Sequence, residues 1–257
     1  MPGLGWIFAR ELIRFGRQPS RVIAALGTPV LVWLVLASGF AAAPPGAGAD
    51  AARTGPYAAY LLPGMAVMVV LFSSIFAAIS LIEDRNAGFL QSVLVSPAPS
   101  WAIALGKVGA ASLLALAQAL PILLAAPLTG VALTPGGFAG AVAALGCVAA
   151  AISGIGLAAA WHVGSVQGFH GVMNLVLMPM WLLSGAFFPV EGAAGWLRFL
   201  MRLNPLTWPS EALRRALLGE AGLPAGPAWA GSIACAVGGL ALPVLVIRRR
   251  AGAGLTA

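Results

Sequence analysis

The sequence predicts an all-α integral membrane protein built from six transmembrane helices. Apolar residues make up 60% of its 257 residues and charged residues only 8%, whereas soluble domains carry about a quarter charged residues. The mean hydropathy is +0.97, and the stretch from Val108 to Val190 contains no Asp, Glu, Lys or Arg. At about 1.5 Å of rise per helical residue, this stretch alone can cross a hydrocarbon core of about 30 Å more than once.

The whole chain, residues 1–257, is predicted to form a single transmembrane domain. Turn residues around Gly130, Pro135 and Gly164 divide the long charge-free stretch into three spans. The complete set of predicted spans is 22–42, 58–82, 105–128, 137–161, 170–188 and 228–247. The first apolar run is too long for the hydrophobic region of a cleaved signal peptide, so we expect it to remain as a span.

The segment before the first span, residues 1–21, is predicted to be an amphipathic helix that lies in the membrane interface. Its apolar residues recur at helical spacing, and its arginines follow the opposite face. These residues are Leu4, Ile7, Phe8, Leu12 and Phe15 against Arg10, Arg14, Arg17 and Arg21. An ordinary basic flank that orients the first span would explain the arginines, but it would not explain the apolar face.

Six spans place both termini on one side of the membrane, and the positive residues indicate which side. In this topology nine of the 14 Lys and Arg residues lie on the side of the termini and five on the other. Because cytoplasmic segments carry an excess of positive charge, both termini are predicted to be cytoplasmic. The segment 83–104 is then cytoplasmic too, and we expect the chain in a bacterial inner membrane.

A short charged insert between the second and third spans is the predicted docking element. Glu83, Asp84 and Arg85 are expected to lie in water or among headgroups, since charge at bilayer depth is costly. Apolar residues then follow at helical spacing until Ser96-Pro97 ends the helix. The candidate residues of this segment are Glu83, Asp84, Arg85, Gly88, Leu90, Leu94, Ser96 and Pro97.

The segment 189–227 is predicted to contain two short amphipathic helices joined by a turn at Asn204-Pro205. An apolar stripe that includes Trp196 marks the first helix, and Gly219 follows the end of the second. Glu211 and Arg215 are placed to pair at i, i+4. The two helices are compatible with a position on the outer surface or with a re-entrant hairpin before the last span.

No nucleotide-binding, metal-binding or catalytic constellation is evident in the sequence. Gly106-Lys107 lacks the first glycine and the following Ser or Thr of a phosphate-binding loop. His162 and His170 have no carboxylate or thiol near them, and both cysteines lie in apolar runs. The net charge of +7 is explained by the flanks of the spans. We therefore expect no enzymatic activity, no cofactor or metal bound by this chain and no nucleic-acid partner.

Mild polar residues within the spans are candidates for a substrate pathway. The candidates are Ser73, Ser74, Gln118 and Asn174. Each is equally suited to an interhelical hydrogen bond. Because none of the acidic residues lies within the predicted spans, the sequence argues against an ion-coupled carrier and favours a hydrophobic or amphipathic substrate.

Two segments resemble ABC-2 type exporter permeases, the group that contains daunorubicin-resistance and Nod-factor export permeases. In the first, the matching residues are Glu83, Arg85, Gly88, Leu90, Leu94, Ser96, Pro97, Gly106 and Lys107. In the second, they are Asn174, Pro179, Ser184-Gly185, Phe188-Pro189, Trp196-Leu197, Asn204-Pro205, Arg214 and Gly219. The two matches together span more than half of the chain.

This resemblance implies a transport subunit whose ATPase is a separate polypeptide that binds ATP and Mg. It implies that 83–97 is a coupling helix seated in that ATPase, present in two copies, and that two permeases pair, commonly as a homodimer. It also implies an outer gate, for which the candidate residues are Pro189, Trp196, Asn204 and Pro205. The alternatives are an integral membrane enzyme that modifies lipids and a non-catalytic membrane assembly factor.

Overall fold

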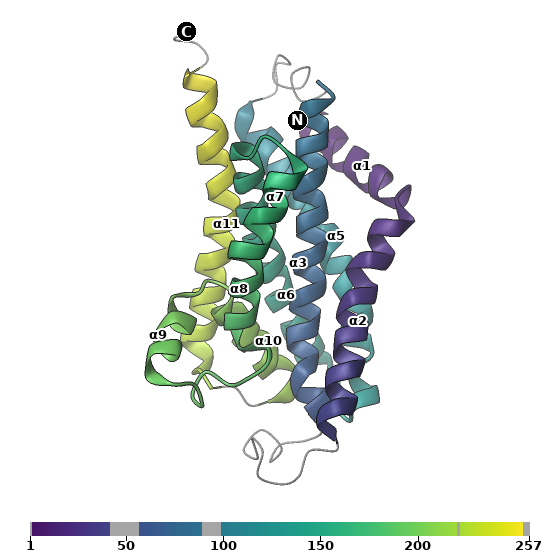
Figure 1. The fold of residues 1–257 in the computed structure, drawn as a ribbon, viewed down its shortest axis with the longest axis vertical. Helices are drawn as coiled ribbons and strands as arrows, with labels where there is room; N and C mark the ends of the chain where they lie inside the picture. Colours follow the sequence, from purple (N-terminus) through teal and green to yellow (C-terminus); the bar gives the residue numbers. More distant parts are fainter. Residues whose placement is uncertain (1, 42–56, 89–98, 220–221, 254–257) are drawn as a thin grey trace.

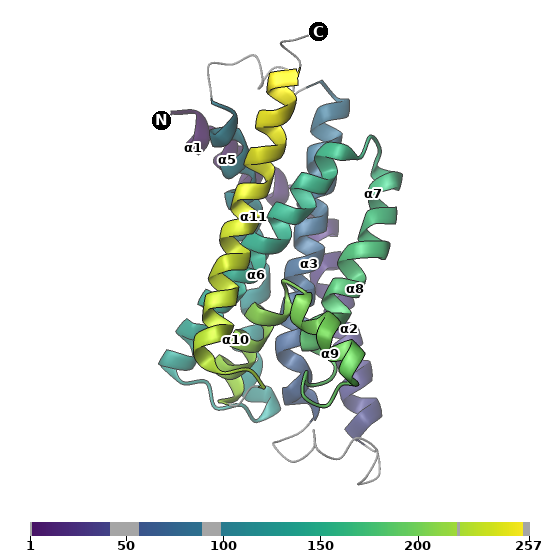
Figure 2. The same ribbon diagram turned by 90° about the vertical axis from the view of Figure 1, so that its left-hand side faces the viewer.

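The chain folds into a bundle of membrane-length helices in the computed structural model, which describes residues 2–41, 57–88, 99–219 and 222–253 (Figures 1 and 2). Within these ranges six helices are long and apolar enough to cross a membrane, and there is no β-strand. The predicted all-α fold class is therefore confirmed.

Five of the spans are continuous helices, and the fifth span is divided. The continuous helices are α2 (Pro19–Ala41), α3 (Tyr57–Asn86), α5 (Ser100–Leu124), α6 (Pro135–His162) and α11 (Ala225–Ala253). Shorter helices are α1 (Pro2–Gly16), η2 (Ala126–Thr129), α9 (Gly195–Leu203) and α10 (Thr207–Leu218). The start of α1 and the end of α11 lie at the same end of the bundle (Figure 1), which we call the terminal end.

The turn residues that divide the predicted spans also cap the helices. The Thr134 side chain accepts a hydrogen bond from the Gly137 amide (3.0 Å), and Pro135 is the first residue of α6. The Ser165 side chain likewise accepts from the Gly168 amide (3.1 Å) where the fifth span begins. These caps satisfy amide groups that have no partner within the helix.

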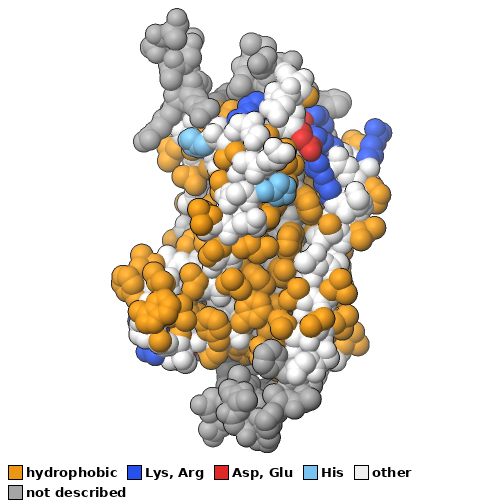
Figure 3. All heavy atoms as spheres, viewed as in Figure 1, with side chains coloured by type: hydrophobic (Ala, Val, Ile, Leu, Met, Phe, Trp, Pro, Cys, Tyr) orange, Lys and Arg blue, Asp and Glu red, His pale blue; other side chains and the backbone are white. Residues whose placement is uncertain are grey.

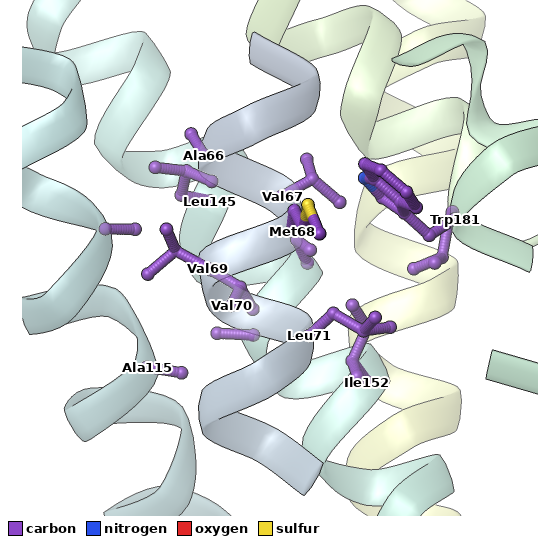
Figure 4. Packing of buried hydrophobic residues seen from close by; sticks show 14 of the residues in the cluster. Ala66, Val67, Met68, Val69, Val70, Leu71, Ala115, Leu145, Ile152 and Trp181 are labelled. Carbon is purple, nitrogen blue, oxygen red and sulfur yellow. The ribbon is translucent and has the colours of Figure 1, made fainter. Parts of the chain in front are cut away.

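The third helix of the chain, α3, is the centre of the bundle and packs against α2, α5 and α6. Its buried residues point in all directions around the helix axis, as Figure 4 shows for the run from Ala66 to Leu71. They contact Ala115 of α5 on one side, Leu145 and Ile152 of α6 on another, and the ring of Trp181 on a third. A helix that is apolar on every face is buried on every face.

The two helices α6 and α11 approach closely because glycines face each other. A Cβ atom built on Gly154 would lie 1.8 Å from the carbonyl oxygen of Gly239, and one built on Gly239 would lie 2.5 Å from that of Ala150. Such contact between backbones is typical of small residues at the interfaces of membrane helices.

The fifth span contains two π-helical turns. It runs through α7 (Val166–Val172), η3 (Met173–Leu177), α8 (Met178–Trp181) and η4 (Leu182–Ala186). Gly185 has φ 87°, a left-handed conformation that favours glycine, and the helix ends there. Wide turns of this kind occur often at functional sites, because they leave backbone groups free for other partners.

The surface of the bundle is apolar over most of its length. Exposed large apolar side chains include Leu31 and Val35 of α2, Leu175 of the fifth span and Ile233 and Val237 of α11. Figure 3 shows apolar side chains over the middle of one face, with Lys, Arg and acidic side chains gathered beside α1 near the terminal end. This distribution matches a multi-pass membrane protein.

Candidate functional site

Charged side chains from four helices form a network at the terminal end. We call it the α1 ion cluster, and it consists of Arg10, Glu11, Arg14, Arg21, Glu83, Asp84 and Lys107. The network joins α1 and the start of α2 to the last turn of α3 and the first turns of α5. Because α3 continues to Asn86, four residues beyond the predicted end of the span, both acids of the insert project from a helix.

Asp84 is the centre of the cluster, and its side chain is only 4% exposed. Its two carboxylate oxygens accept hydrogen bonds from Arg10 (3.1 and 3.2 Å), Arg14 (2.5 Å) and Lys107 (2.9 Å). The position of this side chain differs from our expectation of water or headgroups. The physical reason is that three cations supply the hydrogen bonds that water would otherwise supply.

The remaining ion pairs hold α1 and the start of α2 against α3 and α5. Glu83 accepts from Arg14 (2.9 Å) and Arg21 (2.7 Å), and Glu11 accepts from Lys107 (2.9 Å). The hydrogen bond with Asp84 raises the pKa of Arg10 against the opposing effect of burial. The arginine face that the sequence placed toward water is thus partly directed at acids of the bundle.

The next residues of the insert are also held by the bundle. The guanidinium of Arg85 donates to the carbonyl oxygens of Trp161 (3.2 Å) and Val163, which end α6. These carbonyls have no partner within their own helix. Gly88 has φ 75° and follows the end of α3, so it is placed to redirect the chain away from the helix axis.

The rest of the predicted coupling helix lies outside the residues that the structure describes. This applies to Leu90, Leu94, Ser96 and Pro97. Their role in coupling therefore stays a prediction.

Three of the four candidate pathway residues are buried between helices, and one is on the surface. The Gln118 amide donates to the Ser73 hydroxyl (2.6 Å), so these two candidates meet between α3 and α5. Ser74 instead shares a hydrogen bond with Ser153 of α6 (2.9 Å). Asn174 is exposed on the fifth span.

At the opposite end, α10 and the turn before it bind the backbone of the fifth span. Three side chains donate to three of its carbonyl oxygens: Asn204 to Met180 (2.6 Å), Thr207 to Leu183 (3.2 Å) and Arg214 to Gly185 (2.5 Å). We call these contacts the α10 cluster. The acceptors are carbonyls left free by the π-helical turns and by the helix end.

Arg214 also ties α10 to the start of α3. It donates to the carbonyl oxygen of Tyr60 (3.0 Å), and its guanidinium lies 4.0 Å from the centre of the Tyr60 ring. Glu211, 1% exposed, lies 3.8 Å from the Arg214 guanidinium and accepts from the Gly222 amide (3.0 Å). Burial raises the pKa of Glu211, although Arg214 opposes this shift. The sequence suggested Arg215 as the partner of Glu211, and it did not indicate this buried pair.

The candidate gate residues occupy different environments around this cluster. Asn204 is buried, and its side-chain oxygen accepts from the Leu206 amide (3.1 Å), so it shapes the turn between α9 and α10. Pro205 is next to it and partly buried, whereas Pro189 is exposed. Trp196 is 69% exposed on the apolar stripe of α9.

No metal-ligand constellation appears in the described part of the chain. Those residues contain no group of three or more His, Cys, Asp and Glu side chains able to hold a metal ion. The polar chemistry of the bundle is instead that of ion pairs and of hydrogen bonds to carbonyls.

A bundle of six membrane-length helices with polar networks at both ends is the structure of a multi-pass membrane protein. The chain belongs to the ABC-2 type transporter family, because the sequence model of that family matches residues 3–218. Members of this family are transport permeases that partner with ATP-binding subunits, and they are not themselves enzymes.

Curated relatives agree with this assignment. The chain is 26% identical over 213 residues to "Putative transport permease ycf38" of Cyanophora paradoxa, covering 80% of this chain and 70% of the relative. It is 30% identical over 173 residues to "Probable multidrug ABC transporter permease YbhR" of Escherichia coli strain K12, covering 65% of this chain and 46% of the relative. This chain thus matches about half of the length of YbhR.

Proposed function

We propose that this chain is the permease subunit of an ATP-binding cassette exporter in a bacterial inner membrane. It moves a hydrophobic or amphipathic substrate, of the drug, lipid or glycolipid class, outward with ATP hydrolysed by a separate subunit. The observation that carries the proposal is the family match across residues 3–218. The similarity to YbhR, named a "Probable multidrug ABC transporter permease", supports the drug class.

The terminal end is the cytoplasmic side in this proposal. It carries the arginines of α1, the Lys107 ammonium and the arginines at the end of α11. An excess of positive charge at one end of a bundle supports a cytoplasmic position for that end. The insert that follows α3 then faces the ATP-binding subunit.

Coupling would run along α3, because this one helix contacts both polar clusters. Its 30 residues correspond to roughly 45 Å of helix. At the terminal end it carries Glu83 and Asp84, and at the other end its Tyr60 and Gly64 carbonyls accept from Arg214 and Trp181. Movement of the insert by the ATPase would displace α3 and change the contacts of α10 that close the outer end.

Two copies of the permease act together, most simply as a homodimer with two ATP-binding subunits. The position of Asn174 supports pairing, because this amide is exposed near the middle of the fifth span. An uncovered amide facing lipid is unfavourable, since lipid offers no hydrogen-bond partner. A second copy or an aqueous pathway between copies would cover that face.

The test is transport by variants of the insert in proteoliposomes that contain both subunits. Gly88→Pro should abolish ATP-dependent efflux because proline cannot adopt the φ of 75° found there. Glu83→Ala should also abolish it, since it removes the partner of Arg14 and Arg21. Glu191→Gln, an exposed acid at the other end, is the matched control.

Both variants must still insert into the membrane and run as single species in size-exclusion chromatography. Efflux by Gly88→Pro at the wild-type rate would contradict the coupling role of the insert. Loss of membrane insertion would show a folding defect, and Glu83→Gln would then separate charge from folding.

A further inference from the structure

A polar pocket lies under α1 at the terminal end, between α1, α3 and α5. Its polar rim and walls are formed by three cations, one acid and three uncharged polar residues: Arg14, Arg21, Lys107, Glu11, Gln18, Ser73 and Ser80. Apolar side chains, among them Phe15, Phe76 and Leu114, line the rest. The pocket therefore combines a basic mouth with an apolar wall.

Several hydrogen-bond donors in this pocket are unused by the described residues. The Ser80 hydroxyl is buried, with the residue 6% exposed, and has no hydrogen-bond partner there. The Gln18 side-chain amide makes no hydrogen bond to another described residue. The Lys107 ammonium has three donors, and two of them are engaged by Glu11 and Asp84.

The carboxylates around the pocket, in contrast, are already occupied. Glu11 accepts from Lys107 and lies 3.4 Å from the Arg10 guanidinium, and Glu83 accepts from both Arg14 and Arg21. Across the α1 ion cluster four cations face three carboxylates, so one positive charge is not balanced within the cluster. A surplus of donors and of positive charge selects an anionic ligand with several acceptor oxygens.

The apolar wall adds a second requirement, because a free inorganic anion would leave it unused. A ligand that fits both parts has an anionic phosphate at one end and an acyl chain at the other. Basic pockets between helices at the cytoplasmic side of membrane proteins bind the headgroups of anionic lipids. A basic amphipathic helix such as α1 is attracted to the same lipids.

We propose that this pocket binds the phosphate headgroup of an anionic phospholipid. Gln18, Ser80 and Lys107 donate to the phosphate oxygens, and the acyl chains lie along the apolar wall beside Phe76 and Leu114. The lipid connects α1 to α3 and α5 and so adds to the contacts of the α1 ion cluster. This binding does not depend on the export function and is measurable with the permease chain alone.

The experiment measures thermal unfolding of the purified full chain in a non-ionic detergent. The probes are dioctanoyl phosphatidylglycerol, dioctanoyl phosphatidylcholine and inorganic phosphate, each titrated to obtain an apparent affinity. Phosphatidylglycerol should raise the Tm of the wild type at lower concentrations than either of the other probes. A ligand that binds only the folded state stabilises it by mass action.

Two uncharged variants of the pocket leave the ion pairs in place and have matched controls. Gln18→Leu is compared with Gln167→Leu, which changes an exposed glutamine of α7, and Ser80→Ala with Ser38→Ala, which changes an exposed serine of α2. Each pocket variant should lower the apparent affinity for phosphatidylglycerol roughly 3- to 10-fold, which corresponds to the loss of one hydrogen bond. The controls should titrate as the wild type.

Three outcomes would overturn the proposal. Equal stabilisation by phosphatidylcholine would show that no anionic site exists, and equal behaviour of pocket variants and controls would place the lipid elsewhere. Stabilisation by inorganic phosphate at the same concentrations would show that the site takes a free anion rather than a lipid headgroup.

Discussion

Asp84→Asn tests whether the α1 ion cluster holds the N-terminal helix on the bundle. Asparagine keeps one acceptor oxygen but replaces the other by an amide that points donors at Lys107 and Arg10. Each lost hydrogen bond to a charged group is worth about 1.5–3 kcal/mol. Lys107 is 9% exposed, so the full value applies to its hydrogen bond. Arg10 is 36% exposed and screened by water, so the loss of its hydrogen bond contributes less than about 1 kcal/mol. We therefore expect a loss of about 2–4 kcal/mol.

Thermal unfolding in detergent measures this loss. For a chain of this size it corresponds to a Tm lower by roughly 4–16 °C. Limited trypsin digestion reports on α1 directly, because Arg17 lies in the short connection between α1 and α2 and should be cleaved faster once α1 detaches. Glu191→Gln, which removes an exposed acid, should change neither quantity. An unchanged Tm together with unchanged cleavage of Asp84→Asn would refute the role of the cluster.

Three further predictions concern the rest of the bundle. Arg214→Met should lower the unfolding free energy by about 3–5 kcal/mol, because it leaves the buried Glu211 carboxylate and the Gly185 carbonyl without their partner. A Tm within 2 °C of the wild-type value, which corresponds to a loss of roughly 1 kcal/mol, would contradict this prediction. Gly154→Leu should prevent folding of the bundle, since its Cβ would overlap the Gly239 carbonyl, and a monodisperse variant in size-exclusion chromatography would show that α6 and α11 do not touch. Burial raises the pKa of Glu211 above its ordinary 4.5, so the charged form of this side chain opposes folding. As the pH falls from above the raised pKa toward 4.5, the Tm of the wild type should therefore rise relative to that of Glu211→Gln. Parallel Tm profiles of the two proteins over this pH range would contradict a raised pKa of Glu211.

The number of spans and the all-α fold class can be predicted from the sequence because they depend on local properties. Hydropathy and helix breakers act over one span at a time, so the long run of apolar residues and the turns at Pro135 and Gly164 predict helices that the structure contains. Gly219 shows the same logic, since it has φ 78° and ends α10 as expected of a glycine after a helix.

The polar clusters are not evident in the sequence because their members are far apart in it. Arg10 and Asp84 are separated by 74 residues, and Arg214 and the Tyr60 carbonyl by 154. One signal was present: the arginines of the N-terminal segment repeat at helical spacing, and a row of cations requires either water or acids opposite it. The pairing of Glu211 with Arg214 depends on which face of α10 is buried, and tertiary packing decides this.

The π-helical turns of the fifth span are a second feature that sequence patterns do not specify. Asn204 lies in the turn before α10, and Thr207 and Arg214 lie within α10, yet all three donate to carbonyls within the last two turns of that span. Sequence spacing indicates two short helices after the span. It does not indicate that they supply hydrogen bonds to its backbone.

ATP-dependent transport by a reconstituted pair of subunits tests the central claim most directly. Proteoliposomes with the ATP-binding subunit inserted outward are supplied with ATP and a fluorescent hydrophobic drug, with this chain present or absent. We expect uptake only when both subunits and hydrolysable ATP are present. Uptake of the drug by this chain alone at the same rate, with no requirement for ATP, would contradict the assignment of this chain as the permease of an ATP-driven exporter.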